Sequence, residues 1–241
     1  MRIEVSLTPA LYALRQLRED AVVVAVDVLR ATSSICSAFQ SGAEAIVPLA
    51  SLDGLQAYAD KGYLIAAERG GRKVEAAQLG NSPTEYAAME LAGRRIAYST
   101  TNGTVAILAA REARRLYVGA FANLSALVSR LAAEPEADVV VLCSGWEGDA
   151  SIEDTLFAGA LVQRLGRALP DVQPLNDAAM MAVTLWQAAE SDLYGYCQRA
   201  THVHRLQRFG AEEDIRWALT ADSCTVVPYY DAELSMLQVL K

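Results

Sequence analysis

The chain has 241 residues, of which 53% are hydrophobic and 21% charged, and its net charge is −8. This composition predicts a globular protein with a sizeable core, and the negative charge argues against partners such as nucleic acid or an anionic membrane. Residues 1–20 carry charges throughout and no apolar run reaches about 18 residues, so we expect neither a signal peptide nor a membrane span. The four cysteines form no CxxC pair, which is typical of a reduced, cytoplasmic protein.

Short β-rich segments alternate along the chain with Ala- and Leu-rich segments of helical period, which predicts an α/β fold. The expected strands are 3–7, 21–26, 45–49, 63–67, 95–98, 116–120 and 139–143. The expected helices are 9–18, 33–40, 52–59, 83–91, 105–111, 124–132 and 152–168. From the second strand onward the strands are continuous apolar runs, which indicates that both faces of the sheet are covered. The C-terminal part, 171–241, is expected to be mostly helical, with a short strand at 225–228.

An internal repeat divides this pattern. A shift of 72 residues lays 24–27 on 96–99, and it also matches Thr32 with Thr104. We therefore expect one unit built from two similar βαβ-type halves, about 20–92 and 93–170, with the C-terminal part packed on them. Chance likeness between two βαβ units is the alternative. In a duplicated fold, the cleft between the halves is the natural place for a site.

Polar loops follow four of the expected strands, at the edge where open α/β sheets bind ligands. The first is Asp27-Val28-Leu29-Arg30-Ala31-Thr32. The carboxylate of Asp27 suits Mg²⁺, and the guanidinium of Arg30 suits phosphate or another oxyanion. Leu29 stands where enzymes that form an aspartyl phosphate carry a second Asp, which argues against that mechanism. An Asp27–Arg30 ion pair that caps the helix is the structural alternative.

The second loop combines charge with glycine. It contains Glu68, Arg69, Gly70 and Gly71, and the paired glycines allow backbone amides to approach a ligand closely. It continues to Asn81-Ser82-Pro83, where Asn81 and Ser82 suit ligand binding but also form an ordinary helix start with proline in the first turn.

The third loop, Ser99 to Thr104, follows a strand and opens an apolar helix. Its hydroxyl, carboxamide and amide groups suit a phosphate, although a helix N-cap uses the same residue types. The residues that we expect to contact phosphate are Thr100, Thr101, Asn102, Gly103 and Thr104.

The fourth loop brings Ser144 and Gly145 to Ser151-Ile152-Glu153-Asp154. Glu153 and Asp154 could bind a divalent cation, and acids in the first turn of a helix also occur for purely electrostatic reasons. His202 and His204 lie on an Arg-rich helix, where either proton transfer or simple solvation explains them. Cys143 ends an apolar strand and is expected to be a core residue. Together the loops fit Mg²⁺-assisted handling of a small phosphate ester.

These motifs, in this order and spacing, resemble the 2-phosphosulfolactate phosphatase family over nearly the whole chain. The resemblance implies a three-layer α/β/α fold with an internal duplication. It also implies Mg²⁺-dependent hydrolysis of 2-phospho-3-sulfolactate to 3-sulfolactate, a step in coenzyme M biosynthesis. The family's Ser-x-His-Gly stretch is matched here only at His202, because Ala200 and Val203 replace the Ser and the Gly.

We expect Asp27, Glu68 and Asp154 to bind Mg²⁺, and Arg30 and Arg69 to neutralise the substrate's anionic groups. Asp27, Glu153 and His202 are the expected catalytic residues, with Glu153 orienting the attacking water and His202 protonating the leaving alkoxide. The alternatives are a phosphatase for another small phosphoester and a non-catalytic protein that binds anionic metabolites. Tyr229, Tyr230 and the Ala/Leu-rich helices fit a homodimer and a core role equally well.

Overall fold

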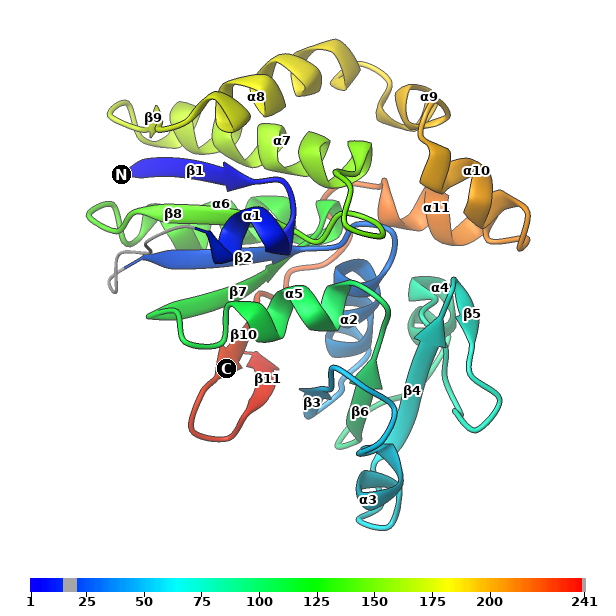
Figure 1. Cartoon of the computed structure of the whole chain (residues 1–241). Coiled ribbons are helices and arrows are strands. Elements are labelled where there is room, and N and C mark those ends of the chain that lie inside the picture. The colour runs from blue at the N-terminus through cyan, green and yellow to red at the C-terminus, as the bar shows by residue number, and fades with distance from the viewer. Residues whose placement is uncertain (15–20, 240–241) are drawn as a thin grey trace.

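The structure, a computed structural model, describes residues 1–14 and 21–239. Within these residues the chain forms one mixed sheet whose strand order is β5-β4-β6-β3-β11-β10-β7-β2-β8-β1-β9 (Figure 1). The strands are β1 (Arg2–Ser6), β2 (Val22–Val26), β3 (Ala45–Pro48), β4 (Leu64–Arg69), β5 (Arg72–Lys73), β6 (Arg95–Ser99), β7 (Arg115–Gly119), β8 (Val139–Cys143), β9 (Gln173–Pro174), β10 (Pro228–Asp231) and β11 (Met236–Val239).

The helices cover both faces of this sheet. They are α1 (Pro9–Ala13), α2 (Ala31–Gln40), α3 (Leu55–Ala59), α4 (Pro83–Ala87), α5 (Gly103–Ala109), η1 (Phe121–Asn123), α6 (Leu124–Ala132), α7 (Ile152–Ala168), α8 (Asp177–Ala189), α9 (Leu193–Cys197), α10 (Thr201–Gln207) and α11 (Glu212–Ala218). The predicted three-layer α/β/α class is therefore confirmed. The far end of the predicted helix 9–18 falls on residues 15–18, outside the described residues.

The parallel strands form two groups, β4-β6-β3 and β7-β2-β8-β1-β9. In one group β6 lies between β3 and β4, and in the other β2 lies between β7 and β8. The first strand of each proposed half therefore pairs with the second and third strands of the other half. This exchange brings the loops that follow β2 and β6 together from opposite groups, although the duplication itself stays a prediction.

An antiparallel hairpin, β10 and β11, joins the two groups. Tyr229 pairs with Tyr117 of β7, and Leu237 pairs with Ile46 of β3. From the sequence we predict a single strand at 225–228, in a C-terminal part that packs on the two halves. The hairpin lies a few residues further on and completes the sheet instead, because these edges of β7 and β3 have no other strand beside them.

Two large apolar clusters lie on opposite faces of the sheet. Alternate side chains of β2 divide between them: Val24 packs toward α6, α7 and α8, whereas Val23 packs toward α1, α2 and α5. The second cluster also includes Ile96 of β6 and Ile46 of β3. Helices α2 and α5 thus share a core with both strand groups, and this fixes the loops at their N-terminal ends relative to each other.

The contact between α7 and α8 depends on a glycine. A Cβ at Gly159 would overlap the carbonyl oxygen of Ala182 and lie 2.8 Å from Cβ of Trp186. We predict that Gly159→Ala lowers the free energy of unfolding by roughly 2 kcal/mol or more, because this backbone contact cannot open without moving a helix. Gly166 lies in the same helix with no neighbouring atom within 4 Å of such a Cβ, so Gly166→Ala should be neutral or stabilising by about 0.5–1 kcal/mol. Urea denaturation checks both variants, and equal effects would contradict the packing argument.

Candidate active site

A polar cleft lies where the loops after β2, β4 and β6 meet helix α10. Seven of the sequence-predicted site residues line it: Asp27, Arg30, Glu68, Asn81, Thr101, Asn102 and His202. Five further lining residues were not predicted: Leu29, Gly71, Trp146, Arg205 and Leu206. The cleft therefore gathers residues that are up to about 180 positions apart in the chain.

Asp27 lies at the end of β2 with its carboxylate buried against the cleft. The backbone of its loop is closed by Thr32, whose Oγ1 accepts a hydrogen bond from Asp27 N at 3.0 Å. The peptide bond between Leu29 and Arg30 in this loop is cis. Burial raises the pKa of Asp27 from 3.8 to about 6, with smaller contributions in the same direction from Glu68 and Glu153, while His202 opposes the shift. A carboxyl whose ionised form is destabilised by burial is suited to binding a cation or to exchanging a proton.

The loop after β6 approaches this carboxylate at Gly103. A Cβ on Gly103 would overlap that of Ala31 and lie 2.6 Å from Oδ2 of Asp27. Only glycine fits there, so its role is the close approach of the two loops. Thr101 and Asn102 then line the cleft beside it.

Thr100 and Thr104 use their hydroxyls within the loop itself. Thr100 Oγ1 accepts from Thr104 N, and Thr104 Oγ1 accepts from Thr100 N, both at 3.1 Å, and both side chains are buried. Neither lines the cleft. The structure therefore separates the predicted phosphate loop into two residues that face the cleft and two that hold its shape.

Glu68 is held in the cleft by the neighbouring loops. Its carboxylate accepts hydrogen bonds from Gly71 N, from Thr101 Oγ1 at 3.1 Å and from Thr101 N at 3.3 Å. Gly70 and Gly71 both have positive φ, +62° and +86°, which lets the chain turn back over this carboxylate. Glu68 thereby joins the end of β4 to the loop after β6.

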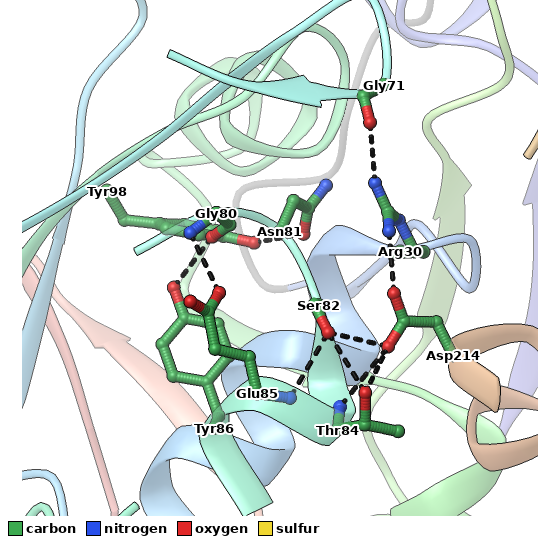
Figure 2. Close-up of polar contacts among 10 residues, drawn as sticks. All are labelled: Arg30, Gly71, Gly80, Asn81, Ser82, Thr84, Glu85, Tyr86, Tyr98 and Asp214. Carbon is green, nitrogen blue, oxygen red and sulfur yellow. Dashed lines mark hydrogen bonds and ion pairs between the residues drawn. The ribbon is translucent and has the colours of Figure 1, made fainter. Parts of the chain in front are cut away.

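Arg30 makes a buried ion pair, but not with Asp27. Its Nη1 donates to Asp214 Oδ2 at 2.7 Å and its Nη2 donates to the carbonyl of Gly71 at 2.9 Å. Asp214 also accepts from the hydroxyls of Ser82 and Thr84, each at 2.6 Å (Figure 2). Ser82 therefore anchors α11 to α4 and does not line the cleft. The two occupied donors leave three N–H groups of Arg30 for an anion.

Asn81 faces the cleft from the start of α4. The hydroxyl of Tyr98 donates to Asn81 Oδ1, and Tyr86 donates to the carbonyl of Gly80 at 2.9 Å, so two buried tyrosines fix this turn (Figure 2). With its oxygen engaged in this way, Asn81 presents its amide nitrogen as a donor for a ligand.

Arg69 binds protein groups. Its Nη1 donates to the carbonyls of Glu68 and Ser99, and its Nη2 donates to Ser99 Oγ at 2.8 Å. The guanidinium thus joins the ends of β4 and β6 and does not line the cleft.

His202 and Glu153 form a pair at the side of the cleft. Glu153 Oε1 lies 2.9 Å from His202 Nδ1, and its Oε2 is buried without a partner. Glu153 does not line the cleft, whereas His202 does and stacks on Trp146 with ring centroids 5.9 Å apart. A carboxylate on Nδ1 orients the imidazole and leaves Nε2 available. Ala200 and Val203, which replace the family's Ser and Gly, pack in the core and hold this helix. His204 is exposed.

Asp154 is buried between two loops. Its Oδ1 accepts from Val28 N at 2.8 Å, and its Oδ2 accepts from Ser144 Oγ and Gly145 N at 3.1 Å. Burial and the neighbouring Asp27 and Glu153 raise its pKa well above the usual value. Within the described part of the chain, no three His, Cys, Asp or Glu side chains are grouped so that they could hold a metal. The structure brings Asp27 and Glu68 to the cleft and leaves Asp154 outside it.

Comparison of the sequence with known proteins assigns the chain to a family. The sequence profile described as 2-phosphosulpholactate phosphatase matches residues 7–233. The chain belongs to this family.

Relatives named as probable 2-phosphosulfolactate phosphatases cover most of the chain. A protein of Synechococcus sp. (strain RCC307) is 42% identical over 86% of this chain and 88% of its own length. One from Prochlorococcus marinus is 39% identical, over 85% and 87% respectively. One from Caldanaerobacter subterraneus is 36% identical over 89% of both chains. Among residues 1–14 and 21–239, the structure has no helix with the length and apolar character that a membrane span requires.

The raised pKa of Asp27 predicts a pH-dependent stability. A carboxyl that ionises at about 6 in the folded chain, against 3.8 as its ordinary value, destabilises the fold once the pH rises through 6. We expect Asp27→Asn, measured with EDTA, to raise the free energy of unfolding at about pH 8 by up to about 3 kcal/mol. The gain should shrink as the pH falls through 6 and vanish near pH 4. Urea denaturation along this pH series checks it, and a gain independent of pH would contradict the assignment.

Proposed function

We propose that this protein hydrolyses the phosphate monoester of a small hydroxy acid, 2-phospho-3-sulfolactate in the first instance, with Mg²⁺ and in the cytoplasm. Its family is one of phosphoric monoester hydrolases. The observation that carries the proposal is the juxtaposition in one cleft of Asp27 and Glu68 with Arg30 and Asn102. Phosphate binding needs cations and donors, whereas the acids serve no purpose in a site that binds only an anion.

The residues present fit Mg²⁺ in its usual mode in phosphate sites. In such sites one or two carboxylates bind the ion, and water and substrate phosphate oxygens complete its octahedron. Asp27 and Glu68 would be those carboxylates here. Burial, with a smaller contribution from the charge of Glu68, raises the pKa of Asp27, and a bound cation would offset both. When bound, the ion would offset the charge of the phosphoryl group and lower the pKa of a coordinated water.

The remaining cleft residues position the ester. Arg30 neutralises phosphoryl oxygens with its free N–H groups, and the pair with Asp214 holds the guanidinium still. Thr101, Asn102 and Asn81 add donors around the same space. His202 protonates the leaving alkoxide through Nε2, and Glu153, which contacts His202, acts as a positioning residue. This place for Glu153 replaces the water-orienting role expected from the sequence.

In coenzyme M biosynthesis, the next step would use 3-sulfolactate, the product of this reaction. The competing function is a non-catalytic protein that binds small anionic metabolites. A phosphatase for another small phosphoester would use the same chemistry. A panel of substrates therefore tests both this alternative and the binding protein.

Phosphate release across a panel tests the proposal. The panel is 2-phospho-3-sulfolactate, 2-phospholactate, phosphoglycolate and glycerol 2-phosphate. We expect turnover in Mg²⁺ that EDTA abolishes, with the sulfolactate ester hydrolysed most efficiently. Asp27→Asn and Arg30→Ala should each lower kcat/KM by about 10²–10³, the usual cost of one positioned charged group. Thermal stabilisation by these compounds without phosphate release would favour the binding protein.

The role of His202 has a test of its own. We expect His202→Ala to lower kcat on alkyl phosphates by about 10²-fold, because an alkoxide leaves poorly without a proton. 4-Nitrophenyl phosphate has a leaving group that needs no proton, so its hydrolysis should change by less than about threefold. Glu153→Gln should lower kcat on alkyl phosphates with the same leaving-group selectivity, because the carboxylate that orients the imidazole of His202 is lost.

His204→Ala is the matched control, since His204 lies on the same helix and is exposed. A loss in His202→Ala that is equal for both leaving groups would assign His202 to substrate binding or folding rather than to proton transfer.

A further inference from the structure

The cleft has two lining arginines, and their surroundings differ. Arg30 is buried and paired with the carboxylate of Asp214 at 2.7 Å. Within residues 1–14 and 21–239, no ion pair or hydrogen bond involves the guanidinium of Arg205. Arg205 therefore presents the one lining arginine charge in the described part of the chain that no carboxylate compensates.

Aromatic rings hold the guanidinium of Arg205 in place. Its Cζ lies 4.7 Å from the centroid of Trp146 and 5.8 Å from that of Phe209. Its Nη2 is also the nearest atom to Gly70, 3.6 Å from where a Cβ of that glycine would lie. A guanidinium stacked by its face keeps the N–H groups at its edge free for hydrogen bonds in its own plane. Arg205 is thus both fixed in position and available to bind.

The position along α10 relates Arg205 to the reacting end of the cleft. Arg205 follows His202 by three residues, and both side chains line the cleft. Side chains at this spacing lie on one helix face with Cβ atoms about 5–6 Å apart. An anion bound by Arg205 would therefore lie next to the group that His202 protonates, on the leaving-group side of the ester.

An arginine that merely shields a tryptophan ring from water is the plain alternative. Arg72 shows that role: it stacks on Phe209 with Cζ 4.7 Å from the ring centroid, is exposed and does not line the cleft. Arg205 differs because it borders the cleft and lies against the glycine loop.

We propose that Arg205 is a specificity residue that binds the acid group, carboxylate or sulfonate, carried by the leaving alcohol of the substrate. The inference rests on the proposed phosphatase function and names the side chain that selects esters whose leaving alcohol carries an acid group. The planar fork of arginine suits the oxygen pairs of both acid groups.

A pair of substrates tests this directly. 2-Phosphoglycerate and glycerol 2-phosphate differ only in a carboxylate that replaces a hydroxymethyl group. We expect Arg205→Ala to lower kcat/KM for 2-phosphoglycerate and for 2-phospho-3-sulfolactate by about 10- to 100-fold, mostly through KM. Hydrolysis of glycerol 2-phosphate should change by less than about twofold. If the sulfolactate ester alone loses efficiency, the bound group is the sulfonate.

The controls are Arg205→Lys and Arg208→Ala. Lysine keeps the charge without the fork and should recover only part of the selectivity. Arg208 lies at the end of the same helix and is exposed, so Arg208→Ala should match the wild type on every substrate. Equal losses in Arg205→Ala on all substrates, or none, would overturn the proposal.

Binding of the product separates this inference from the proposed function. Titration calorimetry with 3-sulfolactate, with lactate and with inorganic phosphate needs no turnover. Arg205→Ala should lose affinity for 3-sulfolactate by about 10-fold or more and keep its affinity for phosphate. A wild-type protein that hydrolyses no ester disproves the phosphatase, whereas unchanged 3-sulfolactate affinity in Arg205→Ala disproves the acid-group site.

Discussion

The close approach of the loops after β2 and β6 is the constraint on which the rest of the site depends. Ala31 and Gly103, equivalent under the 72-residue shift, face each other so closely that one of them must lack a side chain. That contact brings the start of α5 to the carboxylate of Asp27. Since β4 lies beside β6, Glu68 then reaches the backbone and hydroxyl of Thr101. A single glycine therefore determines how closely the third loop, with Thr101 and Asn102, can approach the cleft acid Asp27.

Some charged side chains of the site are paired with protein groups and hold the loops together, whereas others remain available to a ligand. Asp154 is buried, but backbone amides and a hydroxyl satisfy both of its oxygens, so it ties the loop after β2 to the loop after β8. Asp214 holds Arg30 in the same way. At Asp27 burial outweighs the neighbouring His202 and the backbone hydrogen bond from Ala31, so its pKa rises to about 6. The cleft's other arginine, Arg205, lies against aromatic faces. Buried charges are costly unless they are paired, so the uncompensated ones are where a ligand would be most strongly stabilised.

Much of the fold and of the cleft could be predicted from the sequence, because strands, helix starts and strand-end loops are local features. Helices 124–132 and 152–168 have the bounds that were predicted, and seven predicted residues meet in the cleft. Which group a hydrogen-bond donor contacts depends on tertiary packing, which is not a local feature of the sequence. Arg69, Thr100 and Thr104 have the right chemistry for phosphate, but neighbouring backbone groups occupy them. Trp146, Arg205 and Asp214 carry no motif. The packing of α10 and α11 brings Arg205 and Asp214 to the site, and the loop after β8 brings Trp146.

The cleft also shows where specificity would arise in a fold of this kind. The two halves predicted from the sequence would supply similar loops: the hydroxyls of Thr32 and Thr104 each accept a backbone N–H and close the loop after β2 and after β6. Symmetry of this kind can produce a phosphate-sized space, but it cannot distinguish one ester from another. The asymmetric residues come from outside the repeat: α10 contributes His202 and Arg205, and α11 contributes Asp214. Because α10 borders the cleft with His202 and Arg205, changes in this helix would alter the leaving group that is accepted, while Asp27, Glu68 and Arg30 keep their positions.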